Sequence, residues 1–351
     1  MLVGHSDVVG RRVHDVLDRI ADIAITAQVP DGVGAVSALR LQSVDAIVLD
    51  IGDTANNVKV TLSRLFKVDP AAKVVMVSSL TFASVKTSMM GLLAGAAEYI
   101  PTPGAHTKTT DETEFADKLT SVIRALGRSE RTVEARPDPA KARASGKTAK
   151  PITLRPAPQI VPEILVIGSS TGGPQALFTF IASLPPQLKV PILITQHMPA
   201  TFTELLAKHI SKHSGRDCRE GVDGEAIVAN RLYLAPGDWH MVATGAKGSA
   251  KIRLHDGPPV NFCRPSVDPL FESISEIYQS RVMAVILTGM GNDGLEGSRK
   301  VVDAGGMVIA QDEETSVVWG MPRAVAEAGI CSAILPLDGL APFVGKIFGS
   351  R

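Results

Sequence analysis

A short apolar run that ends in a series of small residues constrains the fold of this chain more than any other stretch. Residues 164–167 are branched and apolar, as in a strand buried on both faces of a parallel sheet. Residues 168–173 are too small and flexible to continue a strand, so the chain must turn there. Pro174 suits the first turn of a helix, where its missing N–H costs nothing. The stretch therefore predicts a strand, a tight turn and a helix.

The turn contains the pattern G-x-S-x-G over residues 168–172, with Ser170 at its centre. A serine between a strand and a helix lies close to helix N-terminal N–H groups, which can stabilise an oxyanion. We therefore interpret Ser170 as a nucleophile. Glycine-rich turns also bind phosphates and dinucleotides, but the G-x-G-x-x-G spacing and the Gly-Lys-Ser/Thr ending are both absent. A tight turn without chemistry is the alternative that the motif alone leaves open.

The composition is that of layered α/β domains. The chain has 351 residues, enough for two domains, and is 45% hydrophobic but only 4% aromatic. Acidic and basic residues balance at 36 each, which gives no reason to expect a nucleic-acid or membrane-surface partner. Cys218, Cys263 and Cys331 are scattered, and neither a signal peptide nor a membrane-length apolar run is seen. We therefore expect buried thiols and a cytoplasmic protein without membrane insertion.

Residues 1–127 alternate strand-like and helix-like segments, which predicts a parallel sheet with its function at the carboxyl ends of the strands. Asp50, Ser78 and Thr102 fall at such ends. The region resembles a response-regulator receiver domain, a doubly wound (βα)5 fold, over nearly all of its length. The resemblance implies that Asp50 stands at the phosphoacceptor position and Ser78 at the switch position.

The receiver resemblance fails at the positions that bind cations. Gly4 and His5 stand where the family has an acidic pair that holds Mg²⁺, and Thr102 stands where it has a lysine. Mg²⁺ is usually held by carboxylates, and phosphoryl transfer relies on cations to neutralise charge. We therefore expect a degenerate receiver that takes no phosphate by the usual Mg²⁺-assisted route, with Asp50 as a hydrogen-bonded carboxylate at a strand end.

From residue 128 to residue 160 the sequence becomes charged, contains prolines and has few large apolar residues. Such a segment buries too little surface to offset the entropy of ordering. We expect a receiver-like domain over 1–127, a linker over 128–160 and a catalytic domain over 161–351. The last again alternates strands and helices, which predicts a second doubly wound α/β domain with some antiparallel pairing around residues 231–255.

Three strands of the second domain end in turns with reactive side chains, namely Ser170, His197 and Asp293. Parallel strands would bring all three to one edge of the sheet. A serine nucleophile needs a base within hydrogen-bond reach, and the base needs a third group that fixes its tautomer. His197 and Asp293 fit these roles. Spacing alone leaves rival bases and rival third members open: His240, His255, Asp256 and Asp268.

Residues 161–348 resemble the catalytic domain of the chemotaxis protein-glutamate methylesterase family over nearly their whole length. Six motifs of that family recur in order, at residues 168–173, 196–199, 233–237, 264–268, 287–294 and 320–323. The departure within them is Ser169, where alanine is usual, and we expect this small change to be tolerated. Six ordered motifs are far more specific than any single one.

The resemblance implies a serine hydrolase in which Ser170 is the nucleophile, His197 the base and Asp293 its orienting acid. The backbone N–H groups of Thr171 and Met290 would be the oxyanion donors. The implied reaction is demethylation of glutamate γ-methyl esters on methyl-accepting chemotaxis receptors, without metal or cofactor. The resemblance also allows deamidation of receptor glutamines and contact with a chemotaxis histidine kinase. A non-catalytic chemotaxis adaptor and a small-molecule esterase are the alternatives.

Overall fold

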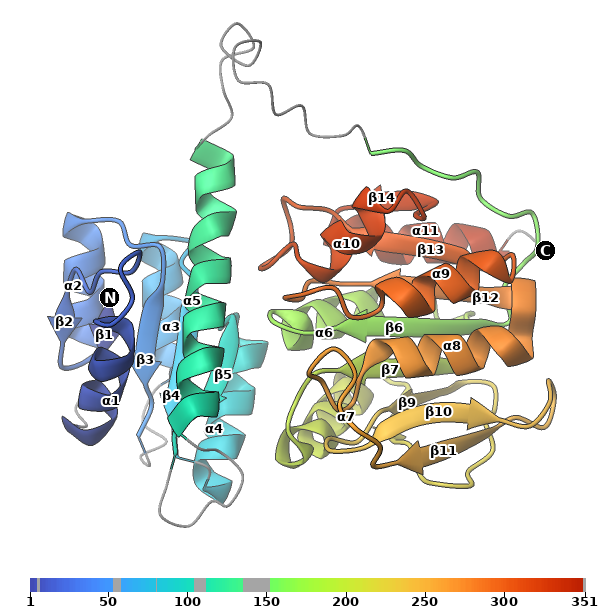
Figure 1. Ribbon diagram of the computed structural model, residues 1–351, viewed down its shortest axis with the longest axis horizontal. Coiled ribbons are helices and arrows are strands. Elements are labelled where there is room, and N and C mark those ends of the chain that lie inside the picture. Colours follow the sequence, from blue (N-terminus) through green and yellow to red (C-terminus); the bar gives the residue numbers. More distant parts are fainter. Residues whose placement is uncertain (5–6, 53–57, 80, 104–111, 135–151, 350–351) are drawn as a thin grey trace, which may run out of the picture. The chain divides into compact units, whose positions relative to one another are not determined.

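Each half of the chain folds around a parallel sheet with helices on both faces (Figure 1). The computed structural model describes residues 1–4, 7–52, 58–79, 81–103, 112–134 and 152–349. Contacts divide the chain into two units, Met1–Gly146 and Lys147–Arg351. None of the helices within the described ranges is long and apolar enough to cross a bilayer.

The first unit contains five parallel strands in the order β2-β1-β3-β4-β5. Its strands are β1 (Leu2–Val3), β2 (Gln28–Val29), β3 (Ile47–Asp50), β4 (Val74–Ser78) and β5 (Glu98–Pro101). Its helices are α1 (Asp7–Leu17), α2 (Gly32–Leu41), α3 (Val58–Val68), α4 (Phe82–Leu93) and α5 (Glu112–Glu134). This order is typical of doubly wound folds and confirms the predicted (βα)5 architecture.

The predicted linker begins inside a helix of the structure. Helix α5 continues to Glu134, past the expected boundary at residue 127. Residues 135–151, the middle of the predicted linker, lie outside the described residues. From residue 152 to residue 160 the chain has no helix or strand, although the Arg155 N–H donates to the Cys331 carbonyl at 2.8 Å in the second unit.

The second unit contains a seven-stranded parallel sheet in the order β14-β13-β12-β6-β7-β9-β8. Its strands are β6 (Ile164–Ser169), β7 (Ile192–Gln196), β8 (Asp217–Glu220), β9 (Arg231–Leu234), β12 (Val282–Ile286), β13 (Met307–Gln311) and β14 (Ala333–Leu335). Its helices are α6 (Gly173–Ser183), α7 (Ala200–Ser214), α8 (Val267–Tyr278), α9 (Leu295–Asp303), α10 (Met321–Glu327) and α11 (Leu337–Gly349).

The antiparallel pairing expected around residues 231–255 occurs in only part of that region. Strands β10 (His240–Thr244) and β11 (Lys251–His255) form an antiparallel hairpin. Strand β9 instead pairs in parallel with both β7 and β8. Strand β8 is only four residues long and largely polar, so its sequence has no strand periodicity that would have predicted it.

Strand β6 is fully buried between β12 and β7, and the strand order reverses beside it. Helix α8 packs closely on this strand, because a Cβ on Gly168 would lie only 2.6 Å from the Val267 side chain. In open α/β sheets, ligands bind outside the carboxyl ends of strands at such a reversal. The loops that follow β12, β6 and β7 therefore meet at one edge.

Candidate active site

Ser170 lies in the tight turn between β6 and α6. The strand, turn and helix expected there are found, but the strand continues through Gly168 and ends at Ser169, two residues later than expected. Gly172 has a φ of 77°, a left-handed conformation that glycine adopts readily. The Ser170 N–H donates to the Thr288 carbonyl at 3.0 Å, and the Ser170 side chain is 5% exposed. A Cβ on Gly289 would lie 2.9 Å from the Ser170 Cβ, so the loop after β12 packs directly on the serine.

The neighbouring Ser169 has a structural partner. Its hydroxyl donates to Gln196 Oε1 at 2.7 Å, and Gln196 Nε2 donates to the Ser170 carbonyl at 2.9 Å. A Cβ on Gly173 would lie only 2.0 Å from that Oε1 atom, so glycine leaves the room this amide needs. The hydroxyl that replaces the usual alanine methyl is therefore accommodated, because it is buried with a hydrogen bond.

His197 and Asp293, from the loops after β7 and β12, form a short contact: Nε2 lies 2.7 Å from Oδ2. Asp293 also accepts hydrogen bonds from the Val267 N–H at 2.6 Å, the Ser266 hydroxyl at 2.7 Å and the Asn261 side chain at 2.9 Å. Burial alone would raise the pKa of Asp293, but His197 and these donors hold it below its usual value. The carboxylate is thus ionised and fixed in place.

The imidazole of His197 has a second neighbour, because Cys263 Sγ lies 3.4 Å from its Nδ1. Burial would lower the pKa of His197, but hydrogen bonding to Asp293 and to Cys263, with their charges, raises it to about 9. A base with this pKa is mostly protonated at neutral pH, so a reaction that needs the neutral ring accelerates as the pH rises toward 9.

We expect an NMR titration of the His197 ring protons to have its midpoint near pH 9, above the ordinary value of 6.5. The measurement uses the full-length protein. Replacing Cys263 with serine should move the His197 midpoint down, since the thiol is one of the groups that raise its pKa. A midpoint near 6.5 in the unmodified protein would contradict this account.

Ser170 and His197 are placed side by side through their backbones, since the His197 N–H donates to the Ser169 carbonyl at 3.1 Å. The hydrogen bonds of the described residues do not include one between the Ser170 hydroxyl and the imidazole. Catalytic hydrogen bonds often lengthen in enzymes without substrate and shorten when it binds. Because Asp293 occupies Nε2, a serine would have to use Nδ1, where it would displace the contact with Cys263.

Two backbone N–H groups border the serine. Thr171 begins the turn that leads into α6, and its carbonyl accepts the Thr288 hydroxyl at 2.9 Å. Met290 follows Gly289, whose carbonyl is fixed by the N–H groups of Gly320 at 3.0 Å and Met321 at 2.8 Å. Within the described ranges the Met290 N–H donates to no protein acceptor, so it can receive a developing negative charge.

The rival histidines and acids have other partners. Both ring nitrogens of buried His240 are occupied, by the Pro258 carbonyl at 3.1 Å and the Ser266 N–H at 3.3 Å. The His255 ring lies beside that of His240, tilted by 30°, with the ring centroids 5.1 Å apart. Asp256 is exposed, and Asp268 accepts from the Gly297 N–H at 2.7 Å. None of them hydrogen-bonds to His197 in the part of the chain that is described.

Neither Cys263 nor Asn261 was predicted from the sequence to belong to this site, and the environment predicted for Cys263 was wrong. Cys263 was expected to be a buried thiol; it is partly exposed and contacts His197, whereas Cys218 and Cys331 are buried. Asn261 donates to both Asp293 and Asp268, at 2.9 Å and 2.7 Å. Both residues lie within three positions before the motif at 264–268, which was the one signal that could have directed attention to them.

In the first unit, Asp50 lies at the end of β3 and accepts the Gly52 N–H at 3.0 Å. A Cβ on Gly4 would lie 2.5 Å from the Asp50 Cβ. Gly4, which stands where the receiver family has a metal-binding acid, therefore lies directly against the Asp50 side chain. Thr102 is buried, and its N–H donates to the Ser78 carbonyl at 2.9 Å. His5 lies outside the described residues.

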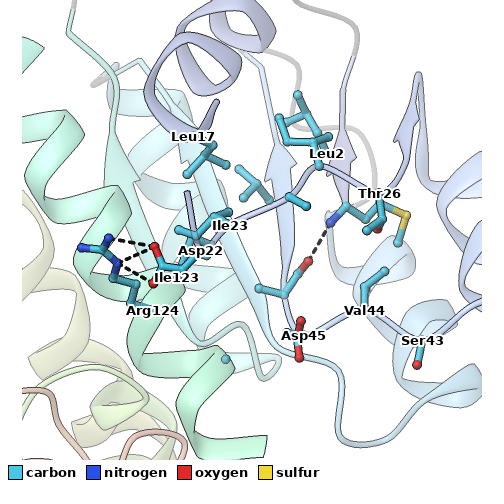
Figure 2. A pocket seen from close by; sticks show the side chains of 16 residues that line it. Leu2, Leu17, Asp22, Ile23, Thr26, Ser43, Val44, Asp45, Ile123 and Arg124 are labelled. Carbon is cyan, nitrogen blue, oxygen red and sulfur yellow. Dashed lines mark hydrogen bonds and ion pairs between the residues drawn. The ribbon is translucent and has the colours of Figure 1, made fainter. Parts of the chain in front are cut away.

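A cavity of about 170 Å³ lies elsewhere in this unit, at the amino-terminal edge of the sheet. Figure 2 shows Leu2 and Asp45 at its wall, with Arg124 paired to Asp22 at 2.8 Å. Both residues of the pair line the cavity. Because Asp50 lies at the opposite, carboxyl-terminal edge, the cavity is separate from the phosphoacceptor position.

Comparisons with known proteins agree with the geometry. The sequence profile described as CheB methylesterase matches residues 165–344. The chain is 46% identical to the protein-glutamate methylesterase/protein-glutamine glutaminase of Azospirillum brasilense, over 100% of this chain and 92% of that protein. It is also 46% identical to a protein of that name, numbered 1, from Paramagnetospirillum magneticum, over 100% and 96%. The Thermotoga maritima CheB methylesterase catalytic domain superposes with a TM-score of 0.52 and 41% identity, over 54% of this chain and 100% of that domain.

Proposed function

This chain belongs to the CheB methylesterase family, and we propose from that premise that it hydrolyses glutamate γ-methyl esters on methyl-accepting chemotaxis receptors. The observation that supports the proposal most is the His197–Asp293 pair at the sheet edge where Ser170 lies. Relatives named protein-glutamine glutaminase support deamidation of receptor glutamines as a second reaction of the same site.

In the proposed reaction, the Ser170 hydroxyl attacks the ester carbonyl carbon while His197 takes its proton at Nδ1. Asp293, held at Nε2, fixes the tautomer and stabilises the positively charged ring. The carbonyl oxygen becomes an oxyanion beside the N–H groups of Thr171 and Met290. Each such donor contributes about 3 kcal/mol to transition-state stabilisation in comparable hydrolases.

The tetrahedral intermediate then collapses, and the leaving oxygen takes the proton from His197 and departs as methanol. A water molecule, deprotonated by the same imidazole, attacks the acyl-serine and releases the receptor glutamate. A glutamine side chain would follow the same path with ammonia as the leaving group. No step requires a metal ion or an organic cofactor.

A methanol-release assay with methylated receptor distinguishes this function from its alternatives. A non-catalytic adaptor would bind receptor without releasing methanol. A small-molecule esterase would cleave p-nitrophenyl esters faster than receptor esters. Methanol release that requires the receptor as substrate supports the proposal, and its absence with correctly folded protein would contradict it.

An exposed aromatic residue at the site favours a macromolecular substrate. Phe262 is fully exposed, at 103% of its reference area, between Asn261 and Cys263. Asn261 and Phe262 both have positive φ angles, of 52° and 62°, in a turn closed by Val260–Cys263 hydrogen bonds of 2.9 and 3.1 Å. Such conformations cost non-glycine residues about 1 kcal/mol or more each and are concentrated at functional sites.

Replacing Phe262 with alanine is therefore expected to raise KM for methylated receptor about tenfold, since burying a phenylalanine contributes about 1.5–3 kcal/mol. The rate constant kcat, and the hydrolysis of a small p-nitrophenyl ester, should change by less than about twofold. Val222→Ala, at another exposed apolar side chain, is the matched control. Equal losses on receptor and on the small ester would instead mean that Phe262 supports the active-site loop.

For the first unit we propose a receiver that Mg²⁺-dependent phosphorylation does not switch, because Gly4 and Thr102 supply neither a carboxylate nor a cation near Asp50. Incubation with Mg²⁺ and a small phosphodonor should give no phosphoaspartate by mass spectrometry. A stable phosphoryl group on Asp50 would contradict this proposal. We also propose a chemotaxis histidine kinase as a docking partner and the cytoplasm as the location of the protein.

A further inference from the structure

Three residues with different metal-binding atoms meet at the candidate active site. One ligand atom each from His197, Cys263 and Asp293 can be chosen so that all three lie within 4.8 Å of one another. Within the described ranges, no other group of three histidine, cysteine or acidic residues is this close. We propose that these three residues form an inhibitory Zn²⁺ site.

The ligand chemistry is that of zinc rather than of harder cations. Zn²⁺ prefers thiolate, imidazole and carboxylate ligands in a tetrahedron with bonds of about 2.0–2.3 Å, whereas Mg²⁺ and Ca²⁺ prefer oxygen. Ligand atoms of such a tetrahedron are about 3.5 Å apart. Separations of up to 4.8 Å therefore need to shrink by as much as about 1.3 Å. The His197 ring must also turn, because Asp293 contacts its Nε2 and Cys263 its Nδ1. Both His197 and Cys263 lie on loops that can supply this movement, between β7 and α7 and before α8.

Charge balance favours the bound ion. A thiolate on Cys263 and a carboxylate on Asp293 together neutralise the two charges of Zn²⁺, and a neutral His197 adds none. The buried site thus stays uncharged overall, which avoids the cost of an unpaired buried charge.

Asp293 is already prepared as a ligand. Its two oxygens accept hydrogen bonds from the Val267 N–H, the Ser266 hydroxyl and the Asn261 amide, so it is ionised and held without the metal. Such supporting hydrogen bonds orient metal ligands and typically change affinity 10–100-fold. The metal would replace two contacts of His197, that of Nε2 with Asp293 and that of Nδ1 with Cys263.

The other two cysteines do not compete for zinc. Burial raises the pKa of the Cys218 and Cys331 thiols to about 12 each, so neither readily forms a thiolate. Both are buried, whereas Cys263 is partly exposed. Zinc that binds through a thiol should therefore bind at Cys263.

Zinc at this position would prevent His197 from accepting the serine proton. The inhibitory part of the inference rests on the proposed function, because it needs a hydrolytic reaction that His197 serves. Binding itself does not depend on that function. The two are therefore measured separately, by zinc binding and by methanol release.

The test uses full-length protein titrated with ZnCl₂ in competition with a chromophoric chelator. We expect one Zn²⁺ per chain in the unmodified protein and in Cys218→Ala, and at least tenfold weaker binding in Cys263→Ser. Co²⁺ in place of Zn²⁺ should give a thiolate-to-metal absorption band that Cys263→Ser lacks. Methanol release, expressed relative to each variant's zinc-free rate, should fall at least tenfold with saturating zinc in the unmodified protein and recover with EDTA.

Absence of stoichiometric zinc binding, or equal binding by the unmodified protein and Cys263→Ser, would overturn the site. Zinc bound through Cys263 with unchanged methanol release would overturn its inhibitory role. If zinc binds through Cys263 but the zinc-free protein releases no methanol, the metal site is supported and the proposed function is the part that fails.

Discussion

Replacing Ser170 with alanine is expected to lower the rate of methanol release from methylated receptor about 10³-fold or more. The alanine keeps the β6–α6 turn, because Ser170 uses its backbone N–H and carbonyl to hold Thr288 and Gln196. What is lost is the oxygen that forms the acyl intermediate. The oxyanion donors and the substrate contacts remain, so residual activity above the uncatalysed rate is also expected.

The neighbouring serine supplies the matched control. Ser169→Ala removes a hydroxyl of the same kind from the next residue, where it donates to Gln196 rather than facing the site. We expect Ser169→Ala to reduce methanol release by less than about tenfold. Circular dichroism and thermal melting of both variants separate loss of chemistry from loss of fold. Methanol release by Ser170→Ala within tenfold of the unmodified rate would exclude Ser170 as the nucleophile.

Replacing Asp293 with asparagine is expected to lower kcat about 10⁴-fold, as loss of the orienting carboxylate does in a comparable triad. Asparagine has one oxygen and one NH₂ group in place of two carboxylate oxygens. If the NH₂ group faces His197 Nε2, the ring must carry its proton on Nδ1 and can no longer accept the serine proton there. If the NH₂ group instead faces the Ser266 hydroxyl and the Asn261 amide, it lies against two groups that donate hydrogen bonds to Asp293 in the unmodified protein.

Either orientation also leaves a buried donor unpaired, so the free energy of unfolding should fall by about 1–3 kcal/mol. The pKa of His197 should fall as well, since Asp293 is one of the groups that raise it. Asp303→Asn, at the exposed last residue of α9, is the control for an aspartate-to-asparagine change. An Asp293→Asn variant that is folded and retains more than a tenth of kcat would show that Asp293 does not orient the base.

Residues at strand ends were the most predictable part of the site. The apolar runs of β6, β7 and β12 are fully buried parallel strands, and parallel strands bring their carboxyl ends to one edge. Strand periodicity and turn composition therefore predicted that Ser170, His197 and Asp293 would gather there. His197 Nε2 and Asp293 Oδ2 lie 2.7 Å apart, while the catalytic roles of the three residues remain predictions.

Contacts made by irregular loops could not be predicted in the same way. Cys263 and Asn261 lie in a turn with positive φ angles, whose path depends on tertiary packing rather than on periodicity. The contacts of Asn261 with Asp293 and of Cys263 with His197 join residues 32 and 66 positions apart in the chain. No pattern of spacing specifies such a pair without a known sheet order.

The first unit shows how a substitution changes a local site without changing the fold. The strand order β2-β1-β3-β4-β5 follows from alternating apolar strands and helices and tolerates the loss of charged side chains. At the carboxyl edge, a Cβ on Gly4 would lie 2.5 Å from the Asp50 Cβ, so a larger residue at position 4 would require Asp50 to move. The expectation of a degenerate receiver depends only on the residues at the carboxyl edge of this sheet, not on the fold of the unit.

The central claim is that Ser170 is a nucleophile activated at this sheet edge, and covalent trapping tests it most directly. A fluorophosphonate reacts with an activated serine by forming an O–P bond and releasing fluoride, and peptide mass spectrometry of the full-length protein locates the adduct. We predict one adduct, on Ser170, that forms far more slowly in the Asp293→Asn variant. An adduct found only on another residue, in protein that releases methanol at its full rate, would contradict the account.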